Sequence, residues 1–505
     1  MRLSLNHNKI LFLAAVVAFS TLMGCKDDDM PTPIIEPEPS TNTGDTTTLD
    51  DGPVDFSNFS DTYAGVATPA MTDQWRHYNV HDPSYVVDDE FTYCYNTDVA
   101  FGHEIRAGIQ IRRSINLVEW EFVGWAFPGI PSQGGNYIRQ NGGEPNPGLW
   151  APYIMKINGE YRLYYSLASN VPRLSAIGLA TSDDPRGPFV EQGLVVTSQN
   201  DGSTHTNAID PTVIVTDNGE HWMYYGSSWD AIYRVQLNPT TGLSQNPNDK
   251  GVRIAHRGFT GNTINGNIEA PEIIYNPEFD QYYMFIAYDW LETKYNVRVG
   301  RSDSPTGPFF DIEGKNMNEL ADDEPMILAP YRFEGHSGWQ GVSHPGVFEK
   351  DGRFYMGHQG RPGVNPFFMV MHVRQLFWTE DGWPLVSCQR YATEEETAVE
   401  EAELIGNWDQ ITYEYQIVPG FAEEQLSPNY IDSEPITLEE GGTISGSTGG
   451  TWSYSSPWLN LAYDNGTTAR VRVERGRDWE NEVPETVLFT GLNDQNITVW
   501  GKKLQ

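Results

Sequence analysis

The sequence is poor in basic residues. It has 32 lysine and arginine residues against 69 aspartate and glutamate residues, which gives a formal net charge of −37. Because binding to nucleic acid requires a basic face for the phosphates, no nucleic-acid partner is expected. A polyanionic polysaccharide is disfavoured for the same reason, whereas a neutral glycan is compatible with this charge.

Cysteine is also scarce, with three residues in a chain of 505. Cys25 lies in the N-terminal phrase "LMGC", which leaves only Cys94 and Cys388 for the rest of the chain. This excludes a disulfide scaffold and a thiolate metal site. A single bridge between these two residues is left open for an oxidising compartment, but two separately buried thiols are favoured.

The N-terminus has the pattern of a targeting segment. Arg2 and Lys9 precede an apolar run over 10–19, which is short for a transmembrane helix and typical of a secretory signal. "LMGC" resembles the bacterial lipobox, which implies a signal peptide over 1–24 and acylation of Cys25. The following "KDDD" resembles an acidic tract that sends lipoproteins to the cell surface. We therefore expect a lipoprotein exposed on the bacterial outer membrane, with an ordinary signal peptide as the alternative.

Residues 25–70 are rich in proline, threonine and aspartate. A segment of this composition buries too little apolar area to order itself, so it is predicted to be a disordered tether. The composition changes after it, since 12% of the whole chain is aromatic and there are 48 glycines. Many short strands and turns are expected from there on.

No convincing long amphipathic helix is present, and one phrase recurs five times instead. The copies are "DPSYVVDDEFTYCY" from Asp82, "APYIMKINGEYRLYY" from Ala151, "DPTVIVTDNGEHWMYY" from Asp210, "APEIIYNPEFDQYYMF" from Ala270 and "HPGVFEKDGRFYMG" from His344. Each has a residue before proline, an apolar run, a turn and an aromatic-rich second strand, as a β-hairpin does. The leading residue, which precedes proline, is expected to be extended.

Five such repeats predict an all-β protein with a five-bladed β-propeller over 71–395, with a β-sandwich as the alternative. The tail over 396–505 alternates as strands do and predicts a smaller C-terminal antiparallel β-barrel or sandwich domain. Whether that domain binds glycan or braces the propeller is left open. Because the first strand of a blade lies innermost, the leading residues of all repeats would meet at one end of the axial channel.

The leading residues would bring three carboxylates and an imidazole into one pocket. The carboxylates are those of Asp82, Asp210 and Glu269, which precedes Ala270. Like charges held close together shift their pKa values apart, so one carboxyl can stay protonated near neutral pH. Glycoside hydrolysis needs such a proton donor and acceptor on opposite sides of a bond, ~6.5–9.5 Å apart in inverting enzymes. Glu272 is the alternative to Glu269, but it lies inside the predicted strand.

Two further groups of residues are candidates for binding. Aromatic side chains at the strand entrances can give sugar rings an apolar platform. The candidates for substrate contact are Trp150, Ser228, Trp229 and Trp290, and each tryptophan is also a candidate core residue. His344 is a candidate metal ligand, and since one imidazole cannot form the usual zinc site, calcium or sodium surrounded mostly by water is expected.

Several of these phrases together resemble one enzyme family. They are "VHDPS", "LWAPYI", "NAIDP", "NIEAPEI" and "MHVRQLFWTEDGWPLVSCQRY", in this order. They resemble those of glycoside hydrolase family 43, most closely its α-1,5-L-arabinanases. The resemblance implies inversion, with Asp82 as the general base, Asp210 tuning the acid and Glu269 protonating the leaving oxygen. It also implies an axial metal at His344, although "SHPG" departs from the "GHN" wording usual there.

The expected activity is hydrolysis of α-1,5-linked L-arabinan by a monomer at the cell surface, with endo action favoured over exo action. The glycine-rich insertion "FPGIPSQGGNYIRQNGGEPNPG" is expected to form a wall of the cleft. An exo-acting α-L-arabinofuranosidase or β-xylosidase of the same family is the alternative enzyme. A non-catalytic surface glycan-binding protein is the alternative from another class.

Overall fold

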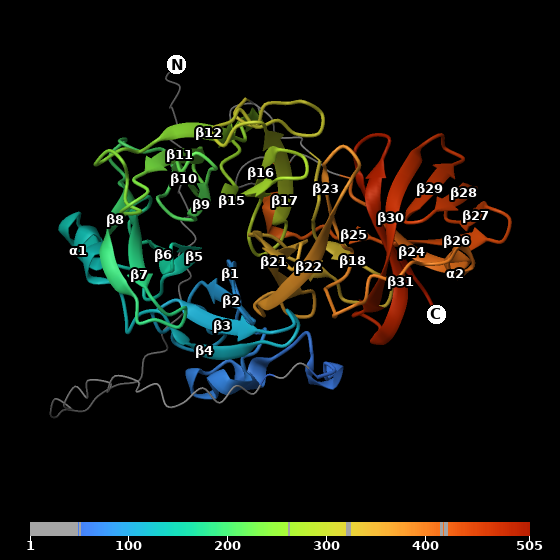
Figure 1. Cartoon of the computed structure of the whole chain (residues 1–505), viewed down its shortest axis with the longest axis horizontal. Helices are drawn as coiled ribbons and strands as arrows, with labels where there is room; N and C mark the ends of the chain where they lie inside the picture. Colours follow the sequence, from blue (N-terminus) through green and yellow to red (C-terminus); the bar gives the residue numbers. More distant parts are fainter. Residues whose placement is uncertain (1–48, 50–51, 261–262, 320–324, 415–417, 419–422) are drawn as a thin grey trace, which may run out of the picture.

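The computed structural model describes residue 49 and residues 52–260, 263–319, 325–414, 418 and 423–505 (Figure 1). The predicted signal peptide, Cys25 and the acidic tract after it lie outside these residues. None of the helices within the described ranges is long and apolar enough to cross a membrane.

The protein is all-β and consists of a β-propeller followed by a closed barrel, which lies at the right of Figure 1. Three four-stranded antiparallel sheets come first in the chain. The first has β1 (Ser84–Asp88), β2 (Phe91–Asn96), β3 (Gln110–Ser114) and β4 (Glu121–Trp125); the second has β5 (Trp150–Ile157), β6 (Glu160–Leu167), β7 (Ser175–Ser182) and β8 (Val190–Ser198); the third has β9 (Thr212–Val215), β10 (His221–Tyr225), β11 (Ala231–Leu237) and β12 (Val252–His256).

Two further sheets follow in the chain. A three-stranded sheet contains β15 (Ile268–Asn276), β16 (Gln281–Tyr288) and β17 (Asn296–Ser302). The last sheet contains β20 (Gly346–Lys350), β21 (Arg353–Pro362), β22 (Val370–Trp378) and β23 (Pro384–Val386), extended by β18 (Tyr331–Arg332), β19 (Trp339–Gln340) and β25 (Ile431–Asp432). Since β25 follows the first barrel strand and pairs in parallel with β18, backbone hydrogen bonds join the two domains.

The first strands of these sheets form a closed ring. β1 contacts β5, β5 contacts β9, β9 contacts β15, β15 contacts β20, and β20 contacts β1. The start of the ring is tied to its end by the backbone N–H of Asp82, which donates to Oε1 of Gln359 at 3.1 Å, 277 residues away. The ring therefore brings the starts of all these strands to a common mouth.

The leading residues of the repeats are not extended, which corrects the expectation drawn from the following proline. Their φ angles are positive: 53° at Asp82, 25° at Ala151, 56° at Asp210, 53° at Ala270 and 56° at His344. A non-glycine residue held in this region costs of order 1–3 kcal/mol. Hydrogen bonds from their N–H groups to the preceding sheet offset this cost: Ala151 donates to Thr97 Oγ1 at 2.7 Å, Asp210 to Ser166 Oγ at 3.1 Å and Ala270 to Asp210 Oδ2 at 3.2 Å.

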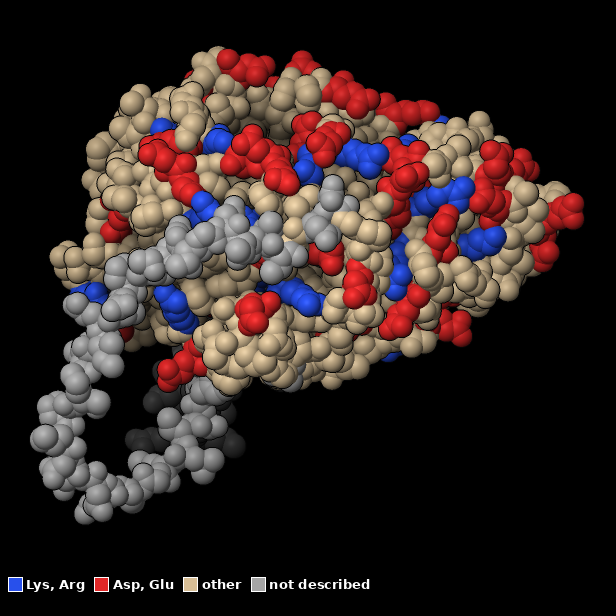
Figure 2. Space-filling model, turned by 60° about the horizontal axis from the view of Figure 1, so that its bottom comes forward, with Lys and Arg blue, Asp and Glu red and all other residues tan. Residues whose placement is uncertain are grey.

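The C-terminal domain is a closed antiparallel barrel, one of the two architectures that its alternating sequence predicts. Its strands are β24 (Gly406–Thr412), β26 (Glu434–Glu439), β27 (Thr443–Gly446), β28 (Gly450–Ser455), β29 (Trp458–Tyr463), β30 (Thr468–Asp478), β31 (Val483–Asn493) and β32 (Thr498–Lys503). Trp408, Trp452 and Phe489 are among its buried core residues. Figure 2 shows basic side chains dispersed among acidic ones on one face of the whole molecule.

The described part of the predicted tether is packed, which differs from the expectation of disorder through residue 70. Tyr63 and Ala67 are buried, and Phe56 and Phe59 each lie 5.3 Å from the ring of Trp479, between β30 and β31 of the barrel. The reason lies in composition, since "VDFSNFSDTYAGVA" supplies aromatic side chains, which the proline- and threonine-rich stretch before it lacks. This segment lies across the junction of the propeller and the barrel.

Two smaller expectations concern the remaining cysteines and the glycine-rich insertion. Cys94 and Cys388 are both free and buried, and they belong to different core clusters, so the prediction of two separate thiols is confirmed. The helical part of the insertion, α1 (Ser132–Gln140), contacts β7 and β8, the outer strands of the second sheet. The backbone N–H of Gln133 donates to Glu191 on β8, so α1 packs on the outer strands of that sheet. Later in the insertion, the N–H of Asn146 donates to the carbonyl oxygen of Ala168 at 3.0 Å, at the mouth end of β6, and a wall formed by this part stays a prediction.

Candidate functional site

The predicted carboxylates and imidazole come together at the mouth of the ring. Nδ1 of His344 lies 2.8 Å from Oδ1 of Asp82, and the N–H of Ala270 donates to Oδ2 of Asp210 at 3.2 Å. The charges of Asp82, Asp210 and Glu269 all act on His344. Four groups that are far apart in the sequence thus form one electrostatic cluster, as the repeat predicts.

Asp82 has the surroundings of a permanent carboxylate. Its side chain is buried, and its Oδ1 faces two imidazoles, with His81 Nδ1 at 2.7 Å and His344 Nδ1 at 2.8 Å. The hydroxyl of Thr97 donates to its other oxygen at 2.6 Å. Burial alone raises the pKa of Asp82, but the charges and hydrogen bonds of His344 and His81 outweigh it and hold the pKa well below its ordinary value. Asp82 is therefore unprotonated, which is the state that a general base needs before the reaction.

Asp210 is shifted in the opposite direction. It is 6% exposed, and burial together with the negative charges of Glu269 and Asp82 raises its pKa well above the ordinary value, although His344 opposes this. Asp210 thus favours its protonated form, whereas Asp82 favours the carboxylate, because their neighbours differ.

The third acid, Glu269, is half-buried at the mouth, where the hydroxyl of Ser227 donates to its Oε2 at 2.7 Å. A register irregularity in the pairing of β15 with β16 lies between Glu269 and Glu272. Glu272 is buried deeper in the strand, and burial raises its pKa to about 8 in spite of hydrogen bonds from Thr212 and the Val347 backbone. Of the two glutamates in "NIEAPE", Glu269 is the one partly open to solvent.

His344 carries the positive charge of the cluster. Burial alone lowers the pKa of this imidazole, but Asp82, Asp210 and Glu269 more than offset burial and raise the pKa to about 9. A protonated imidazole cannot ligate a metal, so an ion bound through Nε2 would first have to displace its proton. Within the described residues, no three His, Cys, Asp or Glu side chains converge to hold a metal directly.

The predicted substrate contacts Trp150, Ser228, Trp229 and Trp290 are all partly exposed. Trp229 has the guanidinium of Arg173 5.8 Å from its ring centre. Ser228 uses its backbone N–H to bind the carbonyl oxygen of Ile268 at 2.9 Å, whereas the neighbouring serine, Ser227, contacts Glu269 through its side chain. The turn that contains Ser228 therefore lies at the acid through Ser227, and contact of Ser228 with substrate stays a prediction.

Sequence reasoning missed several polar residues that support the cluster. They are His81, Thr97, Ser166, Ser227, Tyr295 and Gln359. Four of them lie at or near the mouth end of the second strand of a repeat, after its aromatic residues, as in "YCYNT" and "YYGSS". That position is a signal that could have identified Thr97, Ser166, Ser227 and Gln359, because the second strand of an antiparallel hairpin returns to the mouth.

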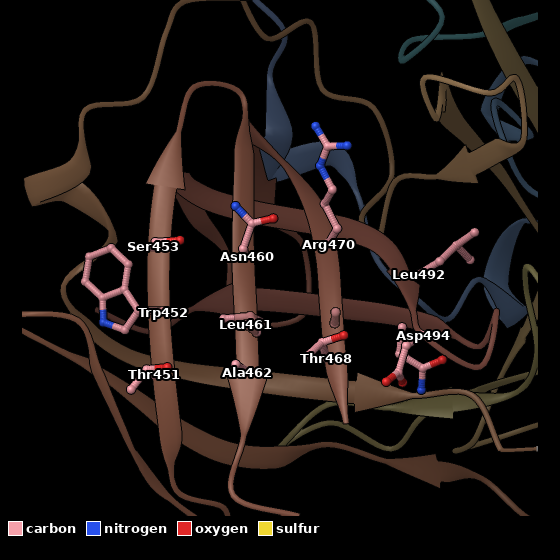
Figure 3. A pocket seen from close by; sticks show the side chains of 12 residues that line it. Thr451, Trp452, Ser453, Asn460, Leu461, Ala462, Thr468, Arg470, Leu492 and Asp494 are labelled. Atoms are coloured by element: carbon pink, nitrogen blue, oxygen red, sulfur yellow. The ribbon is translucent and has the colours of Figure 1, made fainter. Parts of the chain in front are cut away.

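A hollow of about 470 Å³ lies on the barrel, where β28, β29 and β30 run side by side (Figure 3). Ser453, Asn460 and Arg470 lie next to one another across these strands. Arg470 pairs at 2.7 Å with Glu380, which follows β22 at the end of its sheet that is remote from His344. The hollow is therefore separate from the carboxylate cluster.

Comparison with known proteins agrees with this site. Residues 77–384 match the model of glycosyl hydrolases family 43, and residues 388–501 match a C-terminal lipocalin-like domain. The chain is 27% identical over 470 residues to the extracellular endo-alpha-(1->5)-L-arabinanase of Thermotoga petrophila, covering 84% of this chain and 94% of the relative. It is equally similar to the extracellular endo-alpha-(1->5)-L-arabinanase 2 of Bacillus subtilis, over 85% and 94% of the two chains. The crystal structure of the Thermotoga petrophila endo-1,5-alpha-L-arabinanase superposes with a TM-score of 0.73 at 25% identity, covering 85% of this chain and 99% of that one.

Proposed function

The chain belongs to glycosyl hydrolases family 43, and on that premise we propose that it hydrolyses α-1,5-linked L-arabinan with inversion, in endo mode. The observation that carries the proposal is the pair of oppositely shifted aspartates beside Glu269 at one mouth. The choice of arabinan rests on the two curated endo-arabinanases, which match across both domains. Both are described as extracellular, in line with a secreted or surface location.

Three acids are proposed to take part in the proton transfers. The carboxylate of Asp82 accepts a proton from water as the water oxygen bonds to the anomeric carbon. Glu269 gives its proton to the leaving oxygen as the glycosidic bond breaks. Asp210 and Glu269 share one proton in this proposal, because two neighbouring carboxylates oppose each other's ionisation. Solvent exchange then returns a proton to Glu269 and removes one from Asp82.

The propeller is proposed to have five blades. Support comes from the ring of five first strands, β1, β5, β9, β15 and β20, each of which begins one of the repeats. The fourth of these sheets has three strands, and the fifth is shared with strands at the barrel junction. Three full blades and two altered ones would account for both observations.

We also propose that a calcium or sodium ion binds on the axis beside His344. His344 offers an ion only one nitrogen, because its Nδ1 faces Asp82 and Nε2 is the one that is left. Water would therefore fill most other coordination positions. When bound, the ion would add positive charge next to the carboxylates. Removal by a chelator should lower activity, and unchanged activity and melting would contradict an important exchangeable ion.

A lipid anchor on Cys25 at the outer membrane, and a monomeric state, complete the proposal. The support for the anchor is the phrase "LMGC" after a basic and apolar start. The variant Cys25→Ser should leave the membrane fraction and appear in the soluble fraction. Retention of that variant on the membrane would exclude the anchor.

The test of the activity is reducing-sugar release from linear arabinan, with nitrophenyl arabinoside and xyloside as competing substrates. Endo action gives mixed oligosaccharides early, whereas a single product indicates exo action. The variant Glu269→Gln keeps the size of the side chain but removes the acid, and should reduce kcat roughly 10²–10⁴-fold with unchanged circular dichroism. Binding of arabinan without any turnover by the wild-type chain would show a glycan-binding protein instead.

A further inference from the structure

A segment of the barrel domain inserts one side chain into the propeller beside the acid. The short helix η4 (Glu423–Leu426) lies in the connection between β24 and β25, and its Gln425 is 2% exposed. The side-chain Oε1 of Gln425 accepts a hydrogen bond from the N–H of Trp290 at 2.9 Å, and its Nε2 donates to Oδ1 of Asp289 at 2.8 Å. Its backbone oxygen accepts from the hydroxyl of Thr293. All three contacts are to one turn, which follows β16.

Asp289, one of the partners of Gln425, is connected by hydrogen bonds to the start of β15, the strand that carries Glu269. Asp289 is 3% exposed, and its Oδ1 lies 2.7 Å from Nη2 of Arg257 while its Oδ2 accepts from Asn296 at 2.8 Å. The N–H of Asp289 donates to the carbonyl oxygen of Asn267 at 2.9 Å, and Arg257 donates to the same carbonyl at 3.0 Å. Asn267 is two residues before Glu269. The conformation at Asp289 is thus coupled to the start of β15.

The rest of the turn lies between the acid and His344. The carbonyl oxygen of Trp290 accepts from the N–H groups of Thr293 at 3.0 Å and Tyr295 at 3.1 Å. Tyr295 is 1% exposed, and burial together with the negative charge of nearby Glu269 holds its pKa well above the ordinary value. On the other side, the N–H of Gly341, in the segment that leads to His344, donates to the carbonyl oxygen of Thr293 at 2.8 Å. Displacement of this turn would therefore move groups on both sides of the cluster.

We propose that Gln425 is a positioning residue for catalysis, through which the barrel holds the turn over 289–295 and hence the acid Glu269. The inference rests on the proposed function, because it presumes that Glu269 is the acid. A glutamine is the side chain this position needs, since a backbone N–H requires an acceptor and a carboxylate requires a donor, and one amide supplies both. A glutamate would present a second carboxylate to Asp289.

The variant Gln425→Glu distinguishes positioning of the turn from simple attachment of the barrel. The charged group in contact with this position is Asp289, which itself pairs with Arg257. When ionised, the new carboxylate loses its bond to Asp289 and repels it, so kcat on linear arabinan should fall roughly tenfold to a hundredfold relative to wild type. When protonated, the carboxyl again offers one acceptor and one donor. The ratio of variant to wild-type kcat should then rise as the pH falls, with little change in KM.

Two controls separate positioning from attachment of the barrel. Gln425→Ala removes the acceptor and the donor at every pH, so it should lose activity without recovery in acid. Asp432→Asn weakens the exposed pair of Asp432 with Arg332, at 2.6 Å on the same junction, and should keep wild-type kcat. Melting temperatures of all variants are measured alongside, and Gln425→Ala replaces Gln425→Glu if the latter does not fold.

The outcomes are distinct. A kcat within twofold of wild type for both Gln425 variants, with Glu269→Gln inactive, would overturn the role of Gln425 and leave the proposed function intact. A loss of kcat that Asp432→Asn shares, or a loss in Gln425→Glu with no pH recovery, would also overturn it, because attachment alone would explain either result. Full activity of Glu269→Gln would overturn the proposed function itself, whatever the Gln425 variants do.

Discussion

The mouth of the propeller and its junction with the barrel both bury charged groups, but they combine the charges differently. At the mouth, Asp82, Asp210 and Glu269 gather around His344, and burial with like charges raises the pKa of Asp210 well above its ordinary value. At the junction, Nζ of Lys502 lies 2.7 Å from Asp478 and 3.0 Å from Glu480. Burial raises the pKa of Glu480, but Lys502, followed by His336 and Arg390, lowers it to about 2.

The difference indicates what each region is built to do. A site that raises the pKa of a carboxyl is useful for proton transfer, but it lowers the free energy of unfolding above the ordinary pKa of that group. A buried ion pair with every charge compensated holds elements in place, and removing one partner is costly. Variants at the mouth should thus affect rate more than stability, and variants at the junction should do the reverse.

The largest effect on stability is expected for Lys502→Met. This variant leaves Asp478 and Glu480 buried next to each other without their cation, since the Lys502 side chain has an exposed fraction of 0%. The free energy of unfolding should fall by about 3–5 kcal/mol. Denaturant unfolding measures it, and kcat at a temperature where the variant is folded should stay near wild type. A kcat loss as large as that of Glu269→Gln would contradict the separation of the two regions.

A somewhat smaller effect is expected from acid. The folded-state pKa of Glu480 is about 2 against an ordinary value of 4.5, so its contribution is complete above about pH 4.5 and is lost as the pH falls towards 2. The shift corresponds to about 3 kcal/mol. The unfolding free energy of wild type should therefore decrease over this window, and Glu480→Gln should show a shallower decrease. Parallel pH curves for the two proteins would contradict this assignment.

How far the sequence predicts such features depends on whether they repeat locally. Asp82, Asp210 and His344 could be placed at the mouth because each leads the same phrase, and Glu269 because it is offset by one residue. The left-handed conformation of these residues could not be predicted, because the proline after them favours an extended backbone and the compensating hydrogen bonds come from other sheets. A contact across domains leaves no local signal at all, as with Gln425, which lies 135 residues from Trp290.

The sharpest test of the comparison is Asp210→Asn, which is expected to change stability in the opposite direction from Lys502→Met. Burial and the neighbouring carboxylates raise the pKa of Asp210 above its unfolded value, so ionisation of this group favours the unfolded chain at pH 7; a neutral amide of the same shape removes that cost and should raise the free energy of unfolding. The amide oxygen can still accept from the N–H of Ala270. Activity should nevertheless fall, by roughly a hundredfold, since an amide cannot share a proton with Glu269. Denaturant unfolding and kcat on linear arabinan test this prediction. A destabilisation like that of Lys502→Met would mean that Asp210 is ionised and paired, and that the charges at the mouth stabilise the fold as those at the junction do.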